Sequence, residues 1–279
     1  MKPGDLLPRH KRELQRILAY TARYFKRKQF YPRSKVYLDK VVLGHVSKAV
    51  TVARGVLCLV DAGLPEEAFG LSRTLVEVAF NLRFIANKNS ENRATRFVHY
   101  FAVWKLEQIR RGVKHFKTED KQGRPVPKYK RLQLLRQMPE SKELAKLARK
   151  FPNRNSWTQA SKRRRGSAWK MAIEPDKHEM VAGQPVDWEF DYDWVYFWTS
   201  QYVHATVACM DSHSVIPAEA FSVHIAPQRG EHTAGLAVFN VGLYLSKVLV
   251  LAFRAIKHDP PDELLKPLGN LLGDLTRRS

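Results

Sequence analysis

The chain has 279 residues, of which 44% are hydrophobic, and a formal net charge of +21 at pH 7. This apolar content is enough to bury a core, which excludes intrinsic disorder for the bulk of the chain. The two cysteines, Cys58 and Cys209, lie in apolar runs; they exclude a disulfide framework and fit a reducing compartment. The first residues, Met1–Asp5, begin a polar segment without a secretory signal, so we expect a cytoplasmic protein.

The charge is segregated along the chain. Residues 1–60 carry a net charge of +11 and residues 121–170 carry +14, whereas residues 61–120 carry +2 and residues 171–279 carry −6. A segregated basic surface attracts polyanions, most often nucleic acid and sometimes an anionic membrane. The alternative is a solvated basic face that has no specific partner.

The hydrophobic periodicity is helical almost throughout, which predicts an all-α fold, a bundle of six to eight helices. Gly63 is expected to end the second helix, and Pro65, followed by two acidic residues, to begin the third. The helices are expected at about residues 11–28, 34–62, 65–86, 92–116, 128–150, 187–214 and 231–257, with a short one after Pro260-Pro261. The first 33 residues are expected to form a basic helical arm, and residues 34–279 the bundle.

Two segments are expected to be less regular. Residues 117–127 are predicted to form a loop, and residues 117–170 as a whole a basic, partly irregular insert. Apolar and polar residues alternate over residues 221–225, which predicts a short strand. The apolar stretch 235–253 contains Asn240, Ser246 and Lys247, so we expect a buried core helix rather than a membrane span.

The third predicted helix places Arg73, Glu77 and Asn81 at spacings of four, on one stripe of an otherwise apolar helix. Charged groups in such a setting must pair with each other or with a neighbouring helix. They can form a structural ion pair that fixes the register of the bundle. Alternatively, Arg73 is held ready for a phosphate or a carboxylate.

The helix predicted over residues 187–214 places Asp193, Tyr196, Ser200 and His204 near one face. Ser200 and His204 are four residues apart and can touch. Asp211 lies seven residues beyond His204, about 10.5 Å along the helix, too far to complete a catalytic triad. A structural histidine, an acid/base or phosphate-contacting histidine and a metal ligand all stay open for His204.

The basic insert interleaves cations with aromatic residues, a pattern that suits single-stranded nucleic acid because bases stack while phosphates pair with cations. The candidate nucleic-acid-binding residues are Arg149, Lys150, Arg154, Trp157, Lys162, Arg163, Arg164, Arg165 and Lys170. No dinucleotide-binding or Walker motif is present, and we expect neither a cofactor nor a metal.

The order of these motifs resembles a poorly characterised bacterial family of helical proteins with a domain of unknown function. Its helix motif E-A-x-x-L-x-R-x-L-x-E is matched by residues 67–77. An Arg and a Tyr on the following helix are matched by Arg96 and Tyr100, and a Tyr-x-x-x-Ser-x-x-x-His element by Tyr196, Ser200 and His204. The resemblance implies that Arg73, Glu77, Ser200 and His204 converge on one site inside the bundle.

The layout is similar, more distantly, to HEPN proteins, helical and often dimeric, which include metal-independent ribonucleases of toxin and phage-defence systems. Their R-x(4–6)-H signature occurs at Arg93…His99 and Arg110…His115, no more often than chance allows. The basic blocks and these resemblances together lead us to expect a protein of bacterial stress, toxin or phage-defence type that acts on nucleic acid, RNA in particular. A metal-independent ribonuclease is one form of this hypothesis.

Under this hypothesis Arg73 stabilises phosphate charge, Glu77 orients Arg73, and His204 is the acid/base, positioned by Ser200 or Tyr196. The alternatives are a non-enzymatic module that binds nucleic acid or a protein partner, and an enzyme or sensor for a small anionic ligand. No membrane partner is expected; a homodimer and a protein partner from a defence or toxin system stay open.

Overall fold

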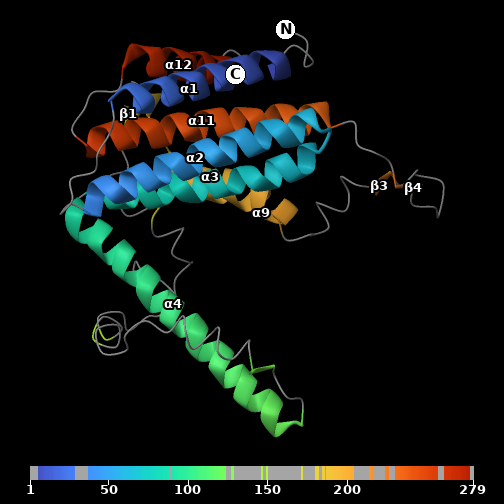
Figure 1. Cartoon of the computed structure of the whole chain (residues 1–279). Coiled ribbons are helices and arrows are strands. Elements are labelled where there is room, and N and C mark those ends of the chain that lie inside the picture. Colours follow the sequence, from blue (N-terminus) through green and yellow to red (C-terminus); the bar gives the residue numbers. More distant parts are fainter. Residues whose placement is uncertain are drawn as a thin grey trace. The chain divides into compact units, whose positions relative to one another are not determined.

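The computed structural model describes most of the predicted helices (Figure 1). The described residues are 6–28, 37–87, 89–123, 127–128, 146, 149, 171, 180–181, 184–185, 187–203, 214–215, 224–225, 230–256 and 261–276. The chain divides into two compact units, one formed by Met1–Ser90 with Met171–Ser279 and the other by Glu91–Lys170.

The described elements are mainly helical, which confirms the predicted all-α class. The first unit contains α1 (Leu6–Lys28), α2 (Tyr37–Asp61), α3 (Pro65–Ala86), α8 (Trp188–Phe190), the π-helix η2 (Asp191–Tyr196), α9 (Phe197–Val203), α11 (Glu231–Ala255) and α12 (Asp262–Thr276). The antiparallel pairs β1 (Met180–Val181) with β2 (Gln184–Pro185), and β3 (Ser214–Val215) with β4 (His224–Ile225), have two residues per strand. The helix α4 (Ser90–Lys121) leads into the second unit.

The first unit is layered around α11. Helices α1 and α12 lie side by side, α11 and α2 form the next layer, and α3 with η2 and α9 follows (Figure 1). Helix α11 packs against α1, α2, α3 and α12, and its central side chains, among them Tyr244, Val248 and Leu249, are almost fully buried. A helix that is apolar on all sides is expected to occupy such a central position.

Among the described helices, two are long and apolar enough to cross a membrane, Tyr37–Asp61 and His232–Ala255. In the second of these, 89% of the apolar window is buried by the rest of the protein. This burial agrees with the prediction that residues 235–253 form a core helix.

The turn between α2 and α3 forms as the sequence predicts. Gly63 adopts a positive φ of 75°, which a glycine adopts without steric cost, and the N–H of Leu64 donates to the carbonyl of Leu59 at 2.9 Å. Pro65 occupies the first helical position of α3, where no intrahelical N–H bond is lost. This turn fixes the direction of α3, the helix that carries Arg73 and Glu77.

Two predicted helices have different bounds in the structure. The helix predicted over 92–116 runs from Ser90 to Lys121, into the predicted loop, because residues 117–122 contain neither Gly nor Pro. The helix predicted over 187–214 begins near its expected start but cannot reach Ser214, which pairs with Ile225. The strand predicted over 221–225 is confirmed at β4 (His224–Ile225), and residues 221–223 lie outside the described residues.

The predicted N-terminal arm and the predicted insert have different outcomes. Helix α1 buries Leu14 and Ile17 and packs against α11 and α12, so its apolar side belongs to the bundle. Of the helix predicted over 128–150, only Lys128, Lys146 and Arg149 are described, and the rest lies outside the described residues.

Candidate functional site

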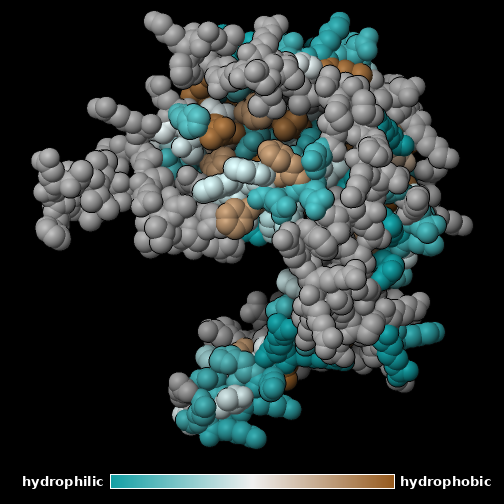
Figure 2. All heavy atoms as spheres, turned by 180° about the vertical axis from the view of Figure 1, so that it is seen from behind, coloured by the Kyte–Doolittle hydropathy of each residue, from teal (hydrophilic) through white to brown (hydrophobic). Residues whose placement is uncertain are grey.

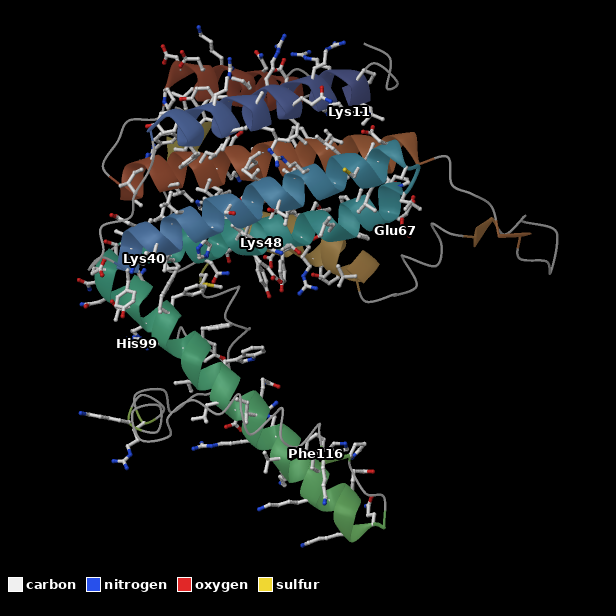
Figure 3. The ribbon with its side chains drawn as sticks, viewed as in Figure 1. Lys11, Lys40, Lys48, Glu67, His99 and Phe116 are labelled. Atoms are coloured by element: carbon white, nitrogen blue, oxygen red, sulfur yellow. The ribbon has the colours of Figure 1, made fainter. Side chains whose placement is uncertain are left out.

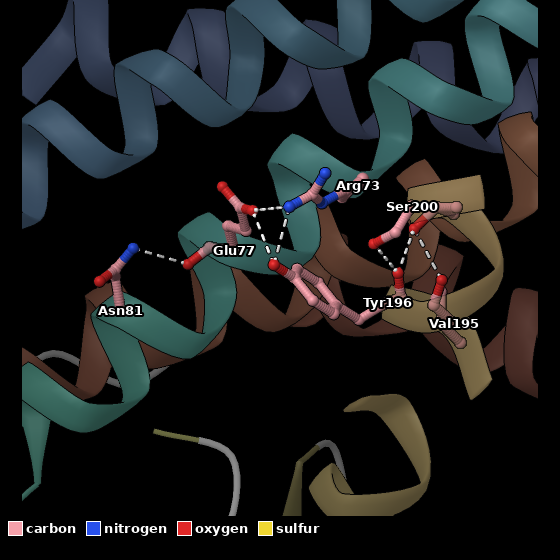
Figure 4. A network of polar contacts seen from close by, with 7 residues as sticks. Arg73, Glu77, Asn81, Val195, Tyr196 and Ser200 are labelled. Atoms are coloured by element: carbon pink, nitrogen blue, oxygen red, sulfur yellow. Dashed lines mark hydrogen bonds and ion pairs between the residues drawn. The ribbon is translucent and has the colours of Figure 1, made fainter. Parts of the chain in front are cut away.

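Helix α3 and the π-helix η2 bring three of the predicted site residues together (Figure 4). The guanidinium of Arg73 donates through Nη2 to the hydroxyl of Tyr196 at 2.8 Å and lies 3.1 Å from Oε1 of Glu77. The Tyr196 hydroxyl in turn donates to the same Oε1 at 3.2 Å. Residues more than a hundred positions apart thus form a closed triangle of polar contacts.

The triangle is partly shielded from water. The side chain of Arg73 is 18% exposed and that of Glu77 is 41% exposed. The guanidinium also lies over the ring of Tyr196, 4.8 Å from its centroid, a cation–π arrangement that restricts its orientation. The charged group is therefore held in place from two sides, while the carboxylate retains access to solvent.

The phenol of Tyr196 stays protonated through the ordinary pH range. Burial raises its pKa above the usual value, and the neighbouring Glu77 carboxylate acts in the same direction, whereas the hydrogen bond from Arg73 opposes the shift. A protonated hydroxyl beside a guanidinium offers two hydrogen-bond donors to an anion. The site therefore has the donor set of an anion-binding site in which a carboxylate occupies the anion position.

The π-helix explains how Tyr196 reaches α3. Tyr192 and Tyr196 stack with ring centroids 5.1 Å apart, and each also contacts the ring of Phe80 at 6.3 Å. Single-turn π-helices occur frequently at functional sites because their wider turn redirects side chains. Here the tyrosines face α3.

The opposite side of the same segment is aromatic and exposed. Phe190, Trp194, Phe197 and Trp198 are between 45% and 56% exposed, and Phe190 and Trp194 stack at 5.9 Å. Asp193, which the sequence placed on the site face, is exposed on this segment. Figure 2 shows brown and near-white side chains grouped at the surface of the first unit.

Ser200 and Asn81 lie near the triangle but bond to their own helices. The Ser200 hydroxyl donates to the backbone carbonyl of Tyr196, and Asn81 Nδ2 donates to the carbonyl of Glu77 at 2.9 Å. Both contacts support backbone next to the triangle rather than adding a donor to it.

The remaining predicted residues fall elsewhere. His204 and Asp211 lie outside the described residues, as do all the basic-insert candidates except Arg149, which is exposed. Arg96 and Tyr100 lie on α4, in the second unit, where Arg96 is exposed and burial raises the pKa of Tyr100. The structure therefore joins Arg73, Glu77 and Tyr196.

A buried ion pair next to the contact between α3 and η2 was not among the predicted contacts. Lys247 of α11 donates to Oδ2 of Asp191 in η2 at 2.5 Å, and both side chains are less than 9% exposed. The ammonium lies 4.8 Å from the ring centroid of Trp188 and 4.7 Å from that of Tyr244. The signal was present, because a single lysine in an apolar helix needs a buried partner.

Arg83, which is 2% exposed, extends the same cluster. Its guanidinium lies 4.8 Å from the ring centroid of Trp188 and donates to the carbonyl of Met171 at 3.4 Å. The Asp191 charge adds to burial in raising the pKa of Tyr244 well above its usual value. These contacts anchor the start of η2 to α3 and α11, and so position Tyr196.

Within the part of the chain that the structure describes, no group of three or more His, Cys, Asp or Glu side chains could hold a metal ion. The guanidinium of Arg73 and the hydroxyl of Tyr196 can hold an anion, and in the structure the carboxylate of Glu77 lies there.

The comparison with known families assigns the chain. Residues 39–219 match a family of unknown function, DUF5677. The chain belongs to this family. The DUF5677 match contains all three residues of the polar triangle, whereas α11 and Lys247 lie beyond it. No curated protein and no solved structure matches the chain.

Proposed function

We propose that this DUF5677 protein acts on nucleic acid, RNA in particular, in the cytoplasm, as part of a bacterial stress, toxin or phage-defence response. Two features support the proposal: the distribution of charge between the two units, and the adjacent hydrogen-bond donors of Arg73 and Tyr196, from which a phosphate can accept. The second is the observation that carries it, because it supplies a defined place for a phosphate.

Most of the excess positive charge lies in the smaller of the two units. Residues 91–170 contain 23 basic and 6 acidic side chains, a net charge of +17, whereas the larger first unit has a net charge of +4. Binding to nucleic acid is driven largely by cations that neutralise phosphates. The small unit is thus suited to hold the polymer backbone, and the nearly neutral bundle to supply a site.

At that site, Arg73 is the phosphate contact. Glu77 pairs with the guanidinium of Arg73 and is 41% exposed, so its carboxylate can turn outward when a phosphate binds. The phosphate then accepts from Arg73 Nη2 and from the Tyr196 hydroxyl, which burial keeps protonated. Such preorganised donors stabilise negative charge without reorganisation.

The ribonuclease form of the proposal, which corresponds to the distant HEPN likeness, adds His204. The 2′-oxygen of the RNA forms a bond to phosphorus as its proton moves to a base, and the bond from phosphorus to the 5′-oxygen breaks as that oxygen takes a proton. His204 serves as the acid/base. The products are a 2′,3′-cyclic phosphate and a 5′-hydroxyl.

The experiment is a cleavage assay with end-labelled RNA in the presence of EDTA. We expect cyclic-phosphate ends from the wild type, a loss of at least about 100-fold in rate for His204→Ala, and a comparable loss for Arg73→Gln. The ribonuclease hypothesis is wrong if RNA stays intact with pure wild-type protein. It is also wrong if the His204→Ala variant cleaves RNA at the wild-type rate. Binding of the RNA without cleavage would leave the broader proposal standing.

One observation favours a second candidate, a non-enzymatic binding module. The Ser200 hydroxyl bonds to its own helix and the Arg73 charge is already paired with Glu77, as in a structural ion pair. Under this alternative, Arg73→Gln lowers the midpoint of thermal unfolding and leaves RNA affinity unchanged. Reduced affinity for RNA at an unchanged midpoint would instead favour the phosphate contact.

A further inference from the structure

The strongest unassigned surface is the exposed side of α4. Its buried side chains Val103, Leu106 and Ile109 recur every three residues and define the inner face. By the helical repeat of 3.6 residues, Phe101, Trp104 and Arg111 lie roughly opposite to that face. All three of these side chains are exposed.

The first half of this outer face is aromatic. Phe101 is 62% exposed and Trp104 is 44% exposed, and their rings stack with centroids 5.9 Å apart and an interplanar angle of 23°. Large stacked rings at this exposure cost free energy in water unless something covers them. A nucleobase can cover them, because every base has a flat face that stacks on aromatic side chains.

The second half of α4 carries exposed cations, on a face turned away from that of the two aromatic rings. Arg110, Lys114, Lys117 and Lys121 follow one another at spacings of four, three and four residues, which places them on one face, and all are exposed. Figure 3 shows nitrogen-tipped side chains around Phe116 at this end of α4, and Figure 2 shows the same end as mostly hydrophilic.

Arg111 connects the two halves. Its angular position lies between those of Trp104 and Lys114, so aromatic rings and cations form one diagonal path that covers about 26 Å from Trp104 to Lys121. Glu107 lies beside this path, 3.7 Å from Arg111, whereas Glu119 has the angular position of Phe101, away from Lys114 and Lys121. The net charge of +2 over residues 61–120 concealed this separation of charges.

We propose that the exposed face of α4, from Phe101 to Lys121, is a docking surface for single-stranded nucleic acid. Bases stack on Phe101 and Trp104, and the following phosphates are bound by Arg111, Lys114 and Lys121. This inference rests on the proposed function and deepens it by naming the surface and the strandedness of the ligand. Stacking requires unpaired bases, so the surface selects single strands over duplexes.

The test measures the binding of the full chain to a fluorescent single-stranded RNA of about twenty nucleotides as salt is raised. Lys114→Gln/Lys121→Gln removes two of these cations, so we expect weaker binding and a log–log salt slope shallower by about 1.4. Phe101→Ala/Trp104→Ala is expected to weaken binding about 5- to 100-fold with the slope unchanged. Arg254→Gln/Lys266→Gln, the same charge change at exposed positions in α11 and α12, is the matched control and is expected to bind as the wild type does.

The outcomes separate this inference from the proposed function. If every α4 variant binds RNA as the wild type does, the docking surface is overturned and the proposed function is left intact. No RNA binding by the wild type overturns both. Equal affinity for a duplex of the same length, or retention on vesicles of phosphatidylcholine and phosphatidylserine without RNA binding, overturns the assignment of a single strand to this face.

Discussion

At the scale of single residues, the contact between Lys247 and Asp191 has the largest expected energetic effect. Both side chains are buried, and each would be left as an uncompensated charge if the other were removed. We expect Lys247→Met and Asp191→Leu each to lower the free energy of unfolding by about 3–5 kcal/mol. The double variant should lose much less than the sum, because both charges disappear together.

Denaturant unfolding of the four proteins of this double-mutant cycle gives the coupling energy. The exposed pair of Lys11 and Asp61 offers a control, since surface ion pairs contribute at most about 1 kcal/mol. Additive losses at Lys247 and Asp191 would show that the pair does not hold η2 in place.

The hydroxyl of Tyr196 is a second residue with a defined contribution. Tyr196→Phe keeps the ring that stacks on Tyr192 and removes the contacts with Arg73 and Glu77. We expect a loss of about 1–3 kcal/mol in unfolding free energy, since a buried guanidinium and a carboxylate each lose a partner. Urea unfolding measures it, and an unchanged midpoint would mean that the triangle contributes nothing to stability.

His45 predicts a pH dependence. Burial lowers the pKa of this side chain below its usual value, and a ring nitrogen lies 2.7 Å from the carbonyl of Val41. Above about pH 6.5 the ring is neutral in both folded and unfolded chains, so it adds no pH dependence. As the pH falls below that value, the unfolded chain takes up a proton that the folded chain does not, and stability decreases.

The size of this effect follows from one proton, up to about 1.4 kcal/mol per pH unit. Unfolding free energies between pH 7 and pH 5 should therefore fall less steeply in His45→Leu than in the wild type. His232→Gln, at an exposed position, should keep the wild-type slope. Equal slopes in all three proteins would contradict the assignment.

At the scale of elements, the sequence predicted those whose signals are local. The end of α2 at Gly63 and the start of α3 at Pro65 depend on a glycine conformation and a proline position that are readable directly. Arg73 and Glu77 were also readable, because charges on an apolar helix must pair. The ring of Tyr196 over Arg73 was not, since its partner lies 123 residues away.

The π-helix shows why the rest was missed. Its extra residue per turn is set by the packing of Tyr192 and Tyr196 on Phe80 and by the Asp191 ion pair, and the run of aromatics continues at helical spacing on both sides. Periodicity therefore predicted one regular helix over residues 187–214. Tertiary contacts decide the local winding, and periodicity carries no information on them.

The contact between the first residues of α3 and α11 gives a prediction about how these two helices pack. A Cβ atom added at Gly230 would lie 2.2 Å from Cγ of Pro65, far below van der Waals contact. Gly230→Ala should therefore lower the unfolding free energy by about 1–3 kcal/mol, because α3 and α11 must separate. Gly235→Ala, inside α11 with no atom within 4 Å of the new Cβ, should stabilise by about 0.5–1 kcal/mol. Thermal unfolding distinguishes the two signs.

At the scale of the whole molecule, the charge of +21 is mostly a property of one unit. Residues 91–170 carry +17 of it, and the bundle that contains Arg73 and Tyr196 carries +4. An evenly spread positive charge would favour solubility over the whole surface. Here the positive charge is concentrated in one unit, and so is the attraction for phosphates. Under the proposed function, holding a polymer and providing a site belong to different units, which makes the two roles separable by experiment.

Replacing residues 91–170 with a Gly/Ser linker tests this separation. The first unit retains the helices that pack on α11, so we expect the shortened chain to unfold in one cooperative transition. Its affinity for RNA should fall by at least about 1,000-fold at low salt, because most phosphate contacts are removed. Anisotropy with the same labelled RNA measures this loss, and calorimetry the transition. A shortened chain that folds and still binds RNA as tightly as the wild type would place the polymer on the bundle, through the cations of α1 and α2, and not on the small unit.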